Sequence, residues 1–575
     1  MPRNKILRCL TYGLLAIALY IIGWLGFNFV GAGVADNEAA VPFATEILGI
    51  DGPLKENGDI DFTQLANDKA SAGVTFENNA AIPIFSNVDS NYLSKYHDDV
   101  IKVLGFQRPQ PGKAGMYRGA SAWATHKNKG LESGGQGSRR RGRGPSRQSQ
   151  IDDFTTRLRH ATDHLWQDAD HPEIAEWLDE MAQPLDKIAL GCKRQHFYIP
   201  LLELPNSSNP FEENSGYFSD VFRDLKTGYQ VRANRNFAKG DFEGWLADLE
   251  TINQLGNLAK SNNFAIGAQL VSNSFHQSAN EMAENIIYGE DLDDDQLLRI
   301  MKVFTGTKNK NSLANSIRFG ERSRALRHLN SIARHGAGAY GNNTNPIWHR
   351  KLLLDCADYN TVFRIVNEDF ERIANYVEDK QANWLKNAWQ LDADMEKRGY
   401  QQGPWNEAAA ILLGRKAKGK FLGDQFSLLL APALWHVVKS ILETDTQKKM
   451  LLLAIALKRF KLHQQAYPDT LDSLVPDYLA QIPRDSYNAA AFVYQKQDGI
   501  YTLYSLGTNG QDDGGKIGDL AHKPLDMLFT PIDSMTWEEF QENERLIERQ
   551  TKWDRASPSD QRPWARGQRI DSGLC

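Results

Sequence analysis

The sequence predicts a mainly α-helical protein with an N-terminal transmembrane helix, a large exported helical domain and a small C-terminal α+β module. Three observations lead to this prediction: an uncharged apolar run at residues 9–30, apolar residues three or four positions apart throughout residues 151–466, and strand-like segments after residue 467. With 41% hydrophobic and 24% charged residues among 575, the composition excludes a wholly disordered chain, a collagen and a polytopic membrane protein.

Charge and cysteine content narrow the function classes further. A net charge of −6 is mild for this length, so we expect no nucleic-acid partner. The four cysteines include no Cys-x-x-Cys pair, which argues against a disulfide scaffold and against a zinc ribbon.

The apolar run at residues 9–30 is about 22 residues long, enough for a helix to cross a hydrocarbon layer of ~30 Å. Arg3, Lys5 and Arg8 precede it, and the first basic residue after it is Lys55. Because basic flanks stay in the cytoplasm, we predict a cytoplasmic stub at residues 1–8 and a single transmembrane helix at residues 9–30, whose partner is membrane lipid. The bulk of the chain then lies in the periplasm, anchored to the bacterial inner membrane.

A cleaved signal peptide is the alternative interpretation of the same run. Gly33-Val34-Ala35 would serve as the cleavage site, although the apolar core of a signal peptide is usually only about 7–15 residues long. Both interpretations export the bulk of the chain. An oxidising compartment would allow Cys192 and Cys356 to pair, and the sequence leaves that pairing open.

Residues 36–125 are mixed in character, with one helix predicted over residues 92–104. From residue 126 to residue 150 apolar periodicity is absent and arginines follow a glycine-rich stretch, so we predict a disordered basic linker. A patch that binds anionic lipid, nucleic acid or a cell-wall polymer is the alternative interpretation.

Residues 151–466 form the predicted helical domain, with about ten helices stacked in pairs and hardly any sheet. Asp293 is placed to cap the helix that begins near Leu297. Thr444 and Gln447 fit a capping box that opens a helix over residues 448–465, and residues 426–442 form a separate buried helix by this interpretation. The clearest apolar stripes are Ile174, Trp177, Leu178, Met181, Leu185 and Ile188; Leu246, Leu249, Ile252, Leu255 and Leu258; and Ile266, Leu270, Phe275, Ala279, Met282 and Ile286.

The chain changes character after residue 467. Segments 492–495 and 501–504 are strand-like, and Asp498-Gly499 between them is typical of a hairpin turn. We therefore predict an antiparallel hairpin within an α+β module at residues 467–530. Residues 531–575 are predicted to form a charged helix and a disordered tail.

Residues 450–520 carry an order of elements that is found in a known module. A helix ends before Tyr467-Pro468, a loop contains Pro483-Arg484-Asp485, and the second strand leads into Ser505-Leu506-Gly507-Thr508-Asn509-Gly510. This order resembles the C-terminal domain of the major pseudopilin of type II secretion systems. The whole chain is also similar to a loose class of single-span bacterial membrane proteins with such a module. The resemblance implies a location and a fold but no activity.

Related pseudopilins bind calcium in the corresponding loop, so the resemblance implies a structural calcium site here. Calcium takes about six to eight oxygen ligands, and glycines let the backbone fold tightly around it. An Asx-rich and glycine-rich turn without metal is the alternative. The candidate ligands are the backbone carbonyl of Leu503 and the side chains of Ser505, Asn509, Asp512, Asp513 and Asp519.

Two polar constellations allow both a structural and a functional interpretation. His160 and His164 have the spacing of zinc ligands, with Asp163, Asp168 and His171 nearby, but flanking arginines favour an exposed helix face. Glu321 lies among apolar positions, and the arginines at positions 318, 322 and 324 favour a structural ion pair over a general base.

Tryptophans are frequent between residues 340 and 440. They could stack on the sugars of a wall polymer if exposed, but their helical spacing favours a place in the core. They are Trp348, Trp384, Trp389, Trp405 and Trp435.

These features favour a non-enzymatic function. We expect an envelope-anchored scaffold or interaction protein, linked to secretion or envelope organisation, with protein partners in the envelope. One alternative is an envelope hydrolase that acts through two carboxylates in a helical cleft. The other is a module that binds a cell-wall polymer.

Overall fold

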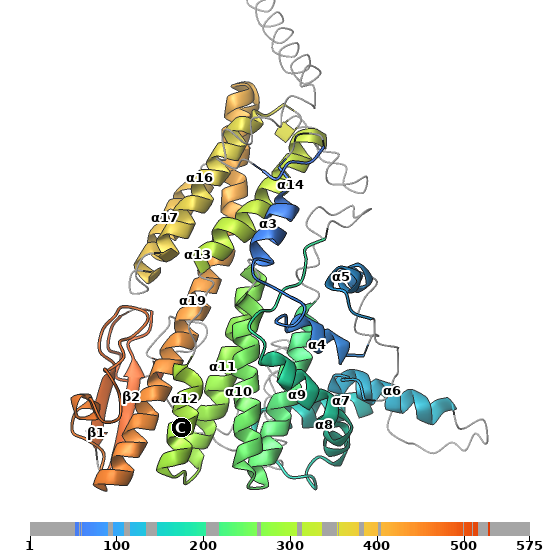
Figure 1. Ribbon diagram of the computed structural model, residues 1–575. Helices are drawn as coiled ribbons and strands as arrows, with labels where there is room; N and C mark the ends of the chain where they lie inside the picture. The colour runs from blue at the N-terminus through green and yellow to red at the C-terminus, as the bar shows by residue number, and fades with distance from the viewer. Residues whose placement is uncertain are drawn as a thin grey trace, which may run out of the picture.

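The structure is mainly helical, with one small antiparallel sheet, as the sequence predicts (Figure 1). The predicted transmembrane helix at residues 9–30 and the tail at residues 531–575 lie outside the described residues. Within the described ranges, no helix combines the length and the apolarity needed to cross a bilayer. The computed structural model describes residues 52–56, 58, 60–89, 96–107, 115–133, 147–202, 218–261, 266–306, 313–335, 353–354, 356–378, 384–400, 404–497, 499–508, 510–515 and 527–528.

The N-terminal part of the described chain is more helical than the sequence suggests. The helix predicted over residues 92–104 is confirmed from Tyr96 onward. The disordered linker predicted at residues 126–150 is wrong at both ends, because one helix continues to Ser133 and the next begins at Arg147. These two helices pack together, with the rings of Trp123 and Phe154 centred 6.3 Å apart. The helices are α3 (Phe62–Ala70), α4 (Ala81–Ser86), α5 (Tyr96–Leu104), α6 (Ala120–Ser133) and α7 (Arg147–Asp163).

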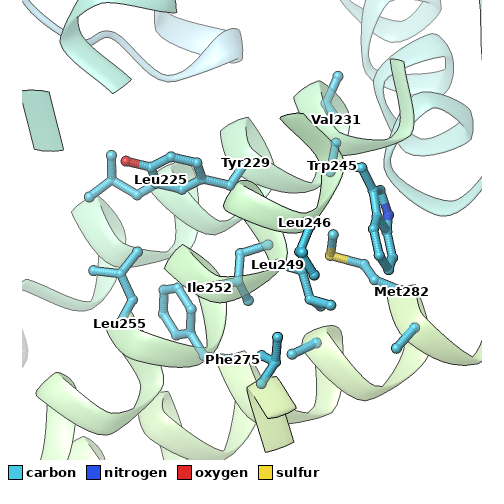
Figure 2. Close-up of a cluster of buried hydrophobic side chains, with 14 of the residues drawn as sticks. Leu225, Tyr229, Val231, Trp245, Leu246, Leu249, Ile252, Leu255, Phe275 and Met282 are labelled. Atoms are coloured by element: carbon cyan, nitrogen blue, oxygen red, sulfur yellow. The ribbon is translucent and has the colours of Figure 1, made fainter. Parts of the chain in front are cut away.

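A first hydrophobic cluster is built around α10, which packs against α9 and α11. Figure 2 shows its centre, where Trp245 and Leu249 of α10 face Phe275 and Met282 of α11. The predicted stripes on α8 and α10 are confirmed as buried, whereas Leu270 on α11 is exposed. The helices are α8 (Pro172–Cys192), α9 (Phe218–Ala238), α10 (Phe242–Ser261), α11 (Ile266–Gly289) and α12 (Asp294–Thr305).

The predicted cap of α12 is confirmed. The Asp293 carboxylate accepts from the backbone N–H of Gln296 at 2.8 Å, and the Gln296 side chain accepts in return from the backbone N–H of Asp293 at 3.0 Å. Two of the N–H groups that a helix start leaves unpaired are thereby satisfied.

A second hydrophobic cluster lies farther along the chain and joins α3 to the helices that follow α12. Its centre includes Ile317, Leu329, Val366 and Phe370, which are all buried. The elements are α13 (Leu313–Asn315), a π-helical turn η3 (Ser316–Glu321), α14 (Arg322–His335), α16 (Tyr359–Glu378) and α17 (Trp384–Tyr400). The next helix, α18 (Pro404–Leu412), belongs to a separate small cluster.

Helix α19 (Arg415–Gln464) has 50 residues and reaches both clusters. At 1.5 Å per residue it is ~75 Å long. In Figure 1 it runs down the molecule and ends beside the sheet. The two helices predicted at residues 426–442 and 448–465 are therefore one, and the predicted capping box at Thr444 is wrong. Gln447 instead donates to Glu284 of α11 at 3.1 Å. The side chain that was predicted to cap a helix thus forms a contact with a neighbouring helix.

The C-terminal module is a three-stranded sheet in the order β1-β2-β3 after a short 3-10 helix, η6 (Leu471–Leu474). The predicted hairpin is confirmed, because β1 (Val493–Gln497) pairs antiparallel with β2 (Ile500–Ser505) and Gln497 lies opposite Ile500. Gly499 has φ of 83°, a left-handed value that glycine adopts readily in such a turn. The third strand, β3 (Met527–Leu528), is too short to show in a sequence pattern.

Candidate functional site

The candidate site is the junction between α19 and the C-terminal module. Its centre is the buried Asp485. The Ser505 hydroxyl at the end of β2 donates to Asp485 Oδ2 at 2.6 Å, and the Tyr487 backbone N–H donates to Oδ1 at 2.9 Å. Thr446 of α19 donates to Oδ1 at 3.5 Å. Burial raises the pKa of Asp485 although these donors favour its ionised form. One carboxylate thus connects a loop, a strand and the long helix.

The neighbouring Ser486 forms a second contact with α19. Its hydroxyl donates to Asp445 Oδ2 at 2.8 Å and accepts from Lys449 Nζ at 2.8 Å. Lys449 also forms an ion pair with Asp445 at 2.9 Å. Burial opposes ionisation of Asp445, but Lys448 and Lys449 outweigh it and hold the pKa of that carboxyl well below its usual range. We call these two contacts, through Asp485 and through Asp445–Lys449–Ser486, the clamp.

Tyrosines fill the apolar side of the same junction. The rings of Tyr467 and Tyr501 are centred 4.8 Å apart, edge to face, and those of Tyr494 and Tyr501 are 5.9 Å apart. The Tyr494 hydroxyl donates to the Pro468 carbonyl at 2.7 Å. Burial raises the pKa of Tyr501 far above its ordinary value, and Tyr288 of α11 hydrogen-bonds to it. The module is therefore held by a packed aromatic contact as well as by the clamp.

The described members of the predicted calcium set make contacts of their own within the module. Leu503 is buried in β2, where it lies opposite Tyr494. The Ser505 hydroxyl is directed to Asp485. The exposed Asp512 accepts from the Tyr504 hydroxyl at 2.9 Å and from the Gly514 backbone N–H at 2.9 Å.

The remaining predicted ligands leave the calcium prediction open. Asp513 is half-buried beside Asp512, while Asn509 and Asp519 lie outside the described residues. Among the described residues, no group of three or more His, Cys, Asp or Glu side chains could hold a metal ion. Calcium binding therefore stays a prediction that includes two undescribed residues.

Sequence reasoning missed the clamp. Asp485 belongs to the Pro483-Arg484-Asp485 motif that was noted for its resemblance, but its role as an acceptor from three segments was not predicted. Asp445 and Lys449 are four residues apart on α19, which is ordinary spacing for a helix ion pair and gives no signal of a tertiary contact.

The histidines lie inside the protein rather than on an exposed face. His160, His164 and His171 are all buried, which corrects the prediction of a solvated helix face. His160 Nδ1 lies 2.8 Å from His171 Nε2, and the ring of His164 is centred 5.0 Å from that of His160. Burial lowers the pKa of His164 and of His171 to about 4, with a smaller contribution from His160.

The carboxylates near the histidines are engaged in other ways. Asp168 binds Arg235 through two hydrogen bonds of 2.6 Å and 2.9 Å, and this contact lowers its pKa. Burial raises the pKa of Asp163. Arg157, one of the arginines that suggested an exposed face, pairs with Asp153 at 2.9 Å and donates to the backbone carbonyl of Asp170 at 3.2 Å.

The structural interpretation of Glu321 is confirmed. This buried carboxylate ends η3, pairs with Arg324 and accepts from the backbone N–H of Ile266, the first residue of α11, at 3.0 Å. Arg318 instead binds Glu371 of α16 at 2.8 Å. Glu321 thus caps one helix and neutralises a charge on another.

A buried carboxylate that the sequence did not single out lies on α11. Glu284 accepts from Gln447 of α19 at 3.1 Å, and burial raises its pKa to about 8. Its neighbour Glu281 also has a pKa raised by burial. Both belong to the α11 face that meets other helices, so an apolar stripe alone does not reveal them.

The cysteines and tryptophans complete the comparison with the sequence. Cys192 and Cys356 are buried and free, so they do not pair. Trp405 is 87% exposed, which corrects the prediction that it belongs to the core. Trp384 is half-buried, and the side chains of the tryptophans at positions 348, 389 and 435 lie outside the described ones.

Comparison with known proteins adds no assignment. No protein-family model, no curated protein and no solved structure matches the chain. The function therefore has to follow from the residues and contacts of the molecule.

Proposed function

We propose that the protein is a membrane-anchored scaffold of the bacterial cell envelope, which presents a periplasmic helical body and its C-terminal module to protein partners. One observation carries this proposal: α19 is continuous through both hydrophobic clusters and is clamped to the module. A scaffold has to hold distant surfaces in a fixed relation, and a packed helix of ~75 Å does so directly.

Two sequence features support the location. The apolar run at residues 9–30 with its basic N-terminal flank supports an inner-membrane anchor and a periplasmic body. The pseudopilin-like order of Tyr467-Pro468, Pro483-Arg484-Asp485 and the glycine-rich loop supports a role near secretion machinery.

The buried polar groups support a scaffold over a hydrolase. Glu321 caps α11, Asp485 joins the module to α19, and Glu284 is hydrogen-bonded between α11 and α19. Each of these three buried carboxylates therefore serves a contact between elements.

The location is tested by fusing reporters to the C-terminus of the full chain. Alkaline phosphatase is active only outside the cytoplasm, whereas a standard green fluorescent protein exported unfolded stays dark there. We expect an active phosphatase fusion and a dark fluorescent fusion. A bright fluorescent fusion with inactive phosphatase would contradict the location and, with it, the envelope role.

The scaffold role is tested by photo-crosslinking in intact cells from Ile500, which is 69% exposed on β2. We expect discrete adducts with envelope proteins, and we expect Asp485→Ala to weaken them at equal protein level because the module loses its fixed position. Crosslinking from Leu190, 65% exposed on α8, is the control for unspecific contacts. Absence of adducts at position 500 would argue against a scaffold. Adducts whose yield Asp485→Ala leaves unchanged would argue against it as well.

A further inference from the structure

Helix α18 is apolar on both of its sides, although only one side is covered. Ala410 and Ile411 pack with Leu353 and with Phe421 of α19 in a small buried cluster. On the other side Trp405 is 87% exposed and Leu412 is 54% exposed, and these two residues are seven positions apart, so they share one helix face. The apolar face of a helix is normally covered by another part of the protein.

The exposed apolar face continues past the end of α18. Leu413, which follows the helix, is 77% exposed. Single exposed apolar residues are normal on a protein surface, but no other stretch of nine residues in the described chain exposes three large ones. Glu407 is two positions from Trp405, about 200° around the helix, and so lies away from this face.

Positive charge adjoins the apolar face at the start of α19. Arg415 and Lys416 are exposed in the first turn of α19, which contains no acidic residue. Basic residues are unfavourable there, because the N-terminus of a helix carries partial positive charge. Lys418 lies three positions after Arg415 in α19 and is buried. Burial and the nearby Arg415 lower its pKa. An anionic surface would offset this concentration of positive charge.

We propose that α18 and the first turn of α19 form a docking surface for an anionic phospholipid bilayer. Trp405 lies at the depth of the headgroups, Leu412 and Leu413 enter the outer acyl region, and Arg415 and Lys416 contact lipid phosphates. Tryptophan, aliphatic and basic residues occur together in helices that lie in a membrane interface. The proposal goes beyond the anchor at residues 9–30, because it concerns the folded body.

The test uses the full chain with Cys9→Ser and Cys575→Ser, so that an introduced cysteine can be labelled while the buried Cys192 and Cys356 remain. Trp405→Cys carries an environment-sensitive fluorophore, and Ile500→Cys on the module is the matched exposed control. The protein is reconstituted into phosphatidylcholine vesicles with or without phosphatidylglycerol, and each set is repeated with spin-labelled lipid as a quencher.

We expect quenching of about twofold or more at position 405 in the anionic vesicles, little in the neutral ones, and none at position 500 in either. Arg415→Glu with Lys416→Glu should abolish the difference between the vesicles. Circular dichroism checks that the variants keep their helices.

Equal signals at positions 405 and 500 in anionic vesicles would overturn the proposal. Shielding of position 405 from a soluble quencher without quenching by lipid would also overturn it, because a protein would then cover the face. Flotation of the chain with vesicles reports the anchor separately. Flotation without quenching at position 405 would therefore reject the docking surface and leave the proposed function standing.

Discussion

At the scale of single residues, the junction depends on oxygen atoms that have their partners inside the protein. Asp485 and Ser505 are buried together, and neither can exchange its partner for water without opening the contact between β2 and the loop that carries Asp485. Removing one member of a buried hydrogen-bonded pair costs more than the pair contributes, because the other member stays desolvated.

Ser505→Ala should therefore lower the free energy of unfolding of the module by about 1–3 kcal/mol. Urea denaturation followed by tyrosine fluorescence and circular dichroism measures the shift, and Ser473→Ala, at an exposed position on η6, is the matched control. A shift no larger than that of the control would show that the hydroxyl is not needed at the junction.

The same variants separate two roles of Ser505. As a donor to Asp485, Ser505 stabilises the module equally with calcium and with chelator. As a calcium ligand, it would matter only when calcium is present. From the 2.6 Å contact we expect the cost of Ser505→Ala to be independent of calcium. A loss seen only with added calcium would favour the metal site that the resemblance implies.

The buried histidines predict how stability depends on pH. His164 and His171 have pKa values lowered from 6.5 to about 4 in the folded protein, so the unfolded chain takes up their protons first as the pH falls. Their contribution is complete above about pH 6.5 and is lost as the pH falls toward 4. His164→Gln should thus show a smaller drop in melting temperature than the native chain between these values. If the melting temperature of His164→Gln fell as far as that of the native chain, groups other than His164 would account for the acid sensitivity.

At the scale of elements, close approach of helix backbones explains where small residues are required. Gly419 in α19 lies against the carbonyl oxygen of Asp358, just before α16, and an added Cβ would come inside contact distance. Gly267 in α11 has open space around it. Both are helical glycines, so they form a matched pair.

Gly419→Ala should destabilise the protein by about 1–3 kcal/mol, because backbone atoms cannot give way as a flexible side chain can. Gly267→Ala should be neutral or stabilising by about 0.5–1 kcal/mol, since alanine favours the helix. Thermal and urea unfolding of the two variants measure the difference. Equal changes in the free energy of unfolding for the two variants would mean that the backbones of α19 and of the residue before α16 do not approach closely.

The elements also show what the sequence could predict. The stripe from Leu246 to Leu258 was predicted because α10 buries one regular face. The continuity of α19 was not, because its two halves enter different clusters and Thr444 and Gln447 imitate a helix start. The burial of His160 was missed because the residues that cover it, such as His171, come from beyond its own helix. Local pattern thus identified most helices but not the contacts between them.

The candidate site was predictable only in part, for the same reason. The hairpin and its turn follow from local signals. The partner of Ser505 does not, since Asp485 lies 20 residues away in the chain and only tertiary folding brings the two side chains together. The exposed apolar face at Leu412 and Leu413 was also missed. An apolar helix pattern predicts burial, and it does not show which faces of the helix the fold leaves uncovered.

At the scale of the whole molecule, the two hydrophobic clusters share α11 and α19 as connecting helices. In Figure 1 these helices run side by side through the middle of the body. Because α19 is unbroken, loosening of one cluster should reach the other through a common backbone. We therefore expect the fold to behave as one cooperative body with two centres of packing.

Phe370→Ala in the second cluster tests this coupling and should cost about 3–5 kcal/mol. We expect faster amide hydrogen exchange at residues 422–442, beside the substitution, and also at residues 450–457 in the first cluster. Leu190→Ala, at an exposed site, should leave both segments unchanged. Faster exchange confined to residues 422–442 would show that the clusters open independently.

The length of α19 gives the protein mechanical reach. A tilt of about 10° at its start would displace its far end by about 13 Å over a ~75 Å arm. The sheet sits at that far end, while Trp405 and Leu413 sit at the start. Because α19 is packed into both hydrophobic clusters, such a tilt would have to carry its buried neighbours with it, and it would arrive at the sheet as a displacement of about the diameter of a helix.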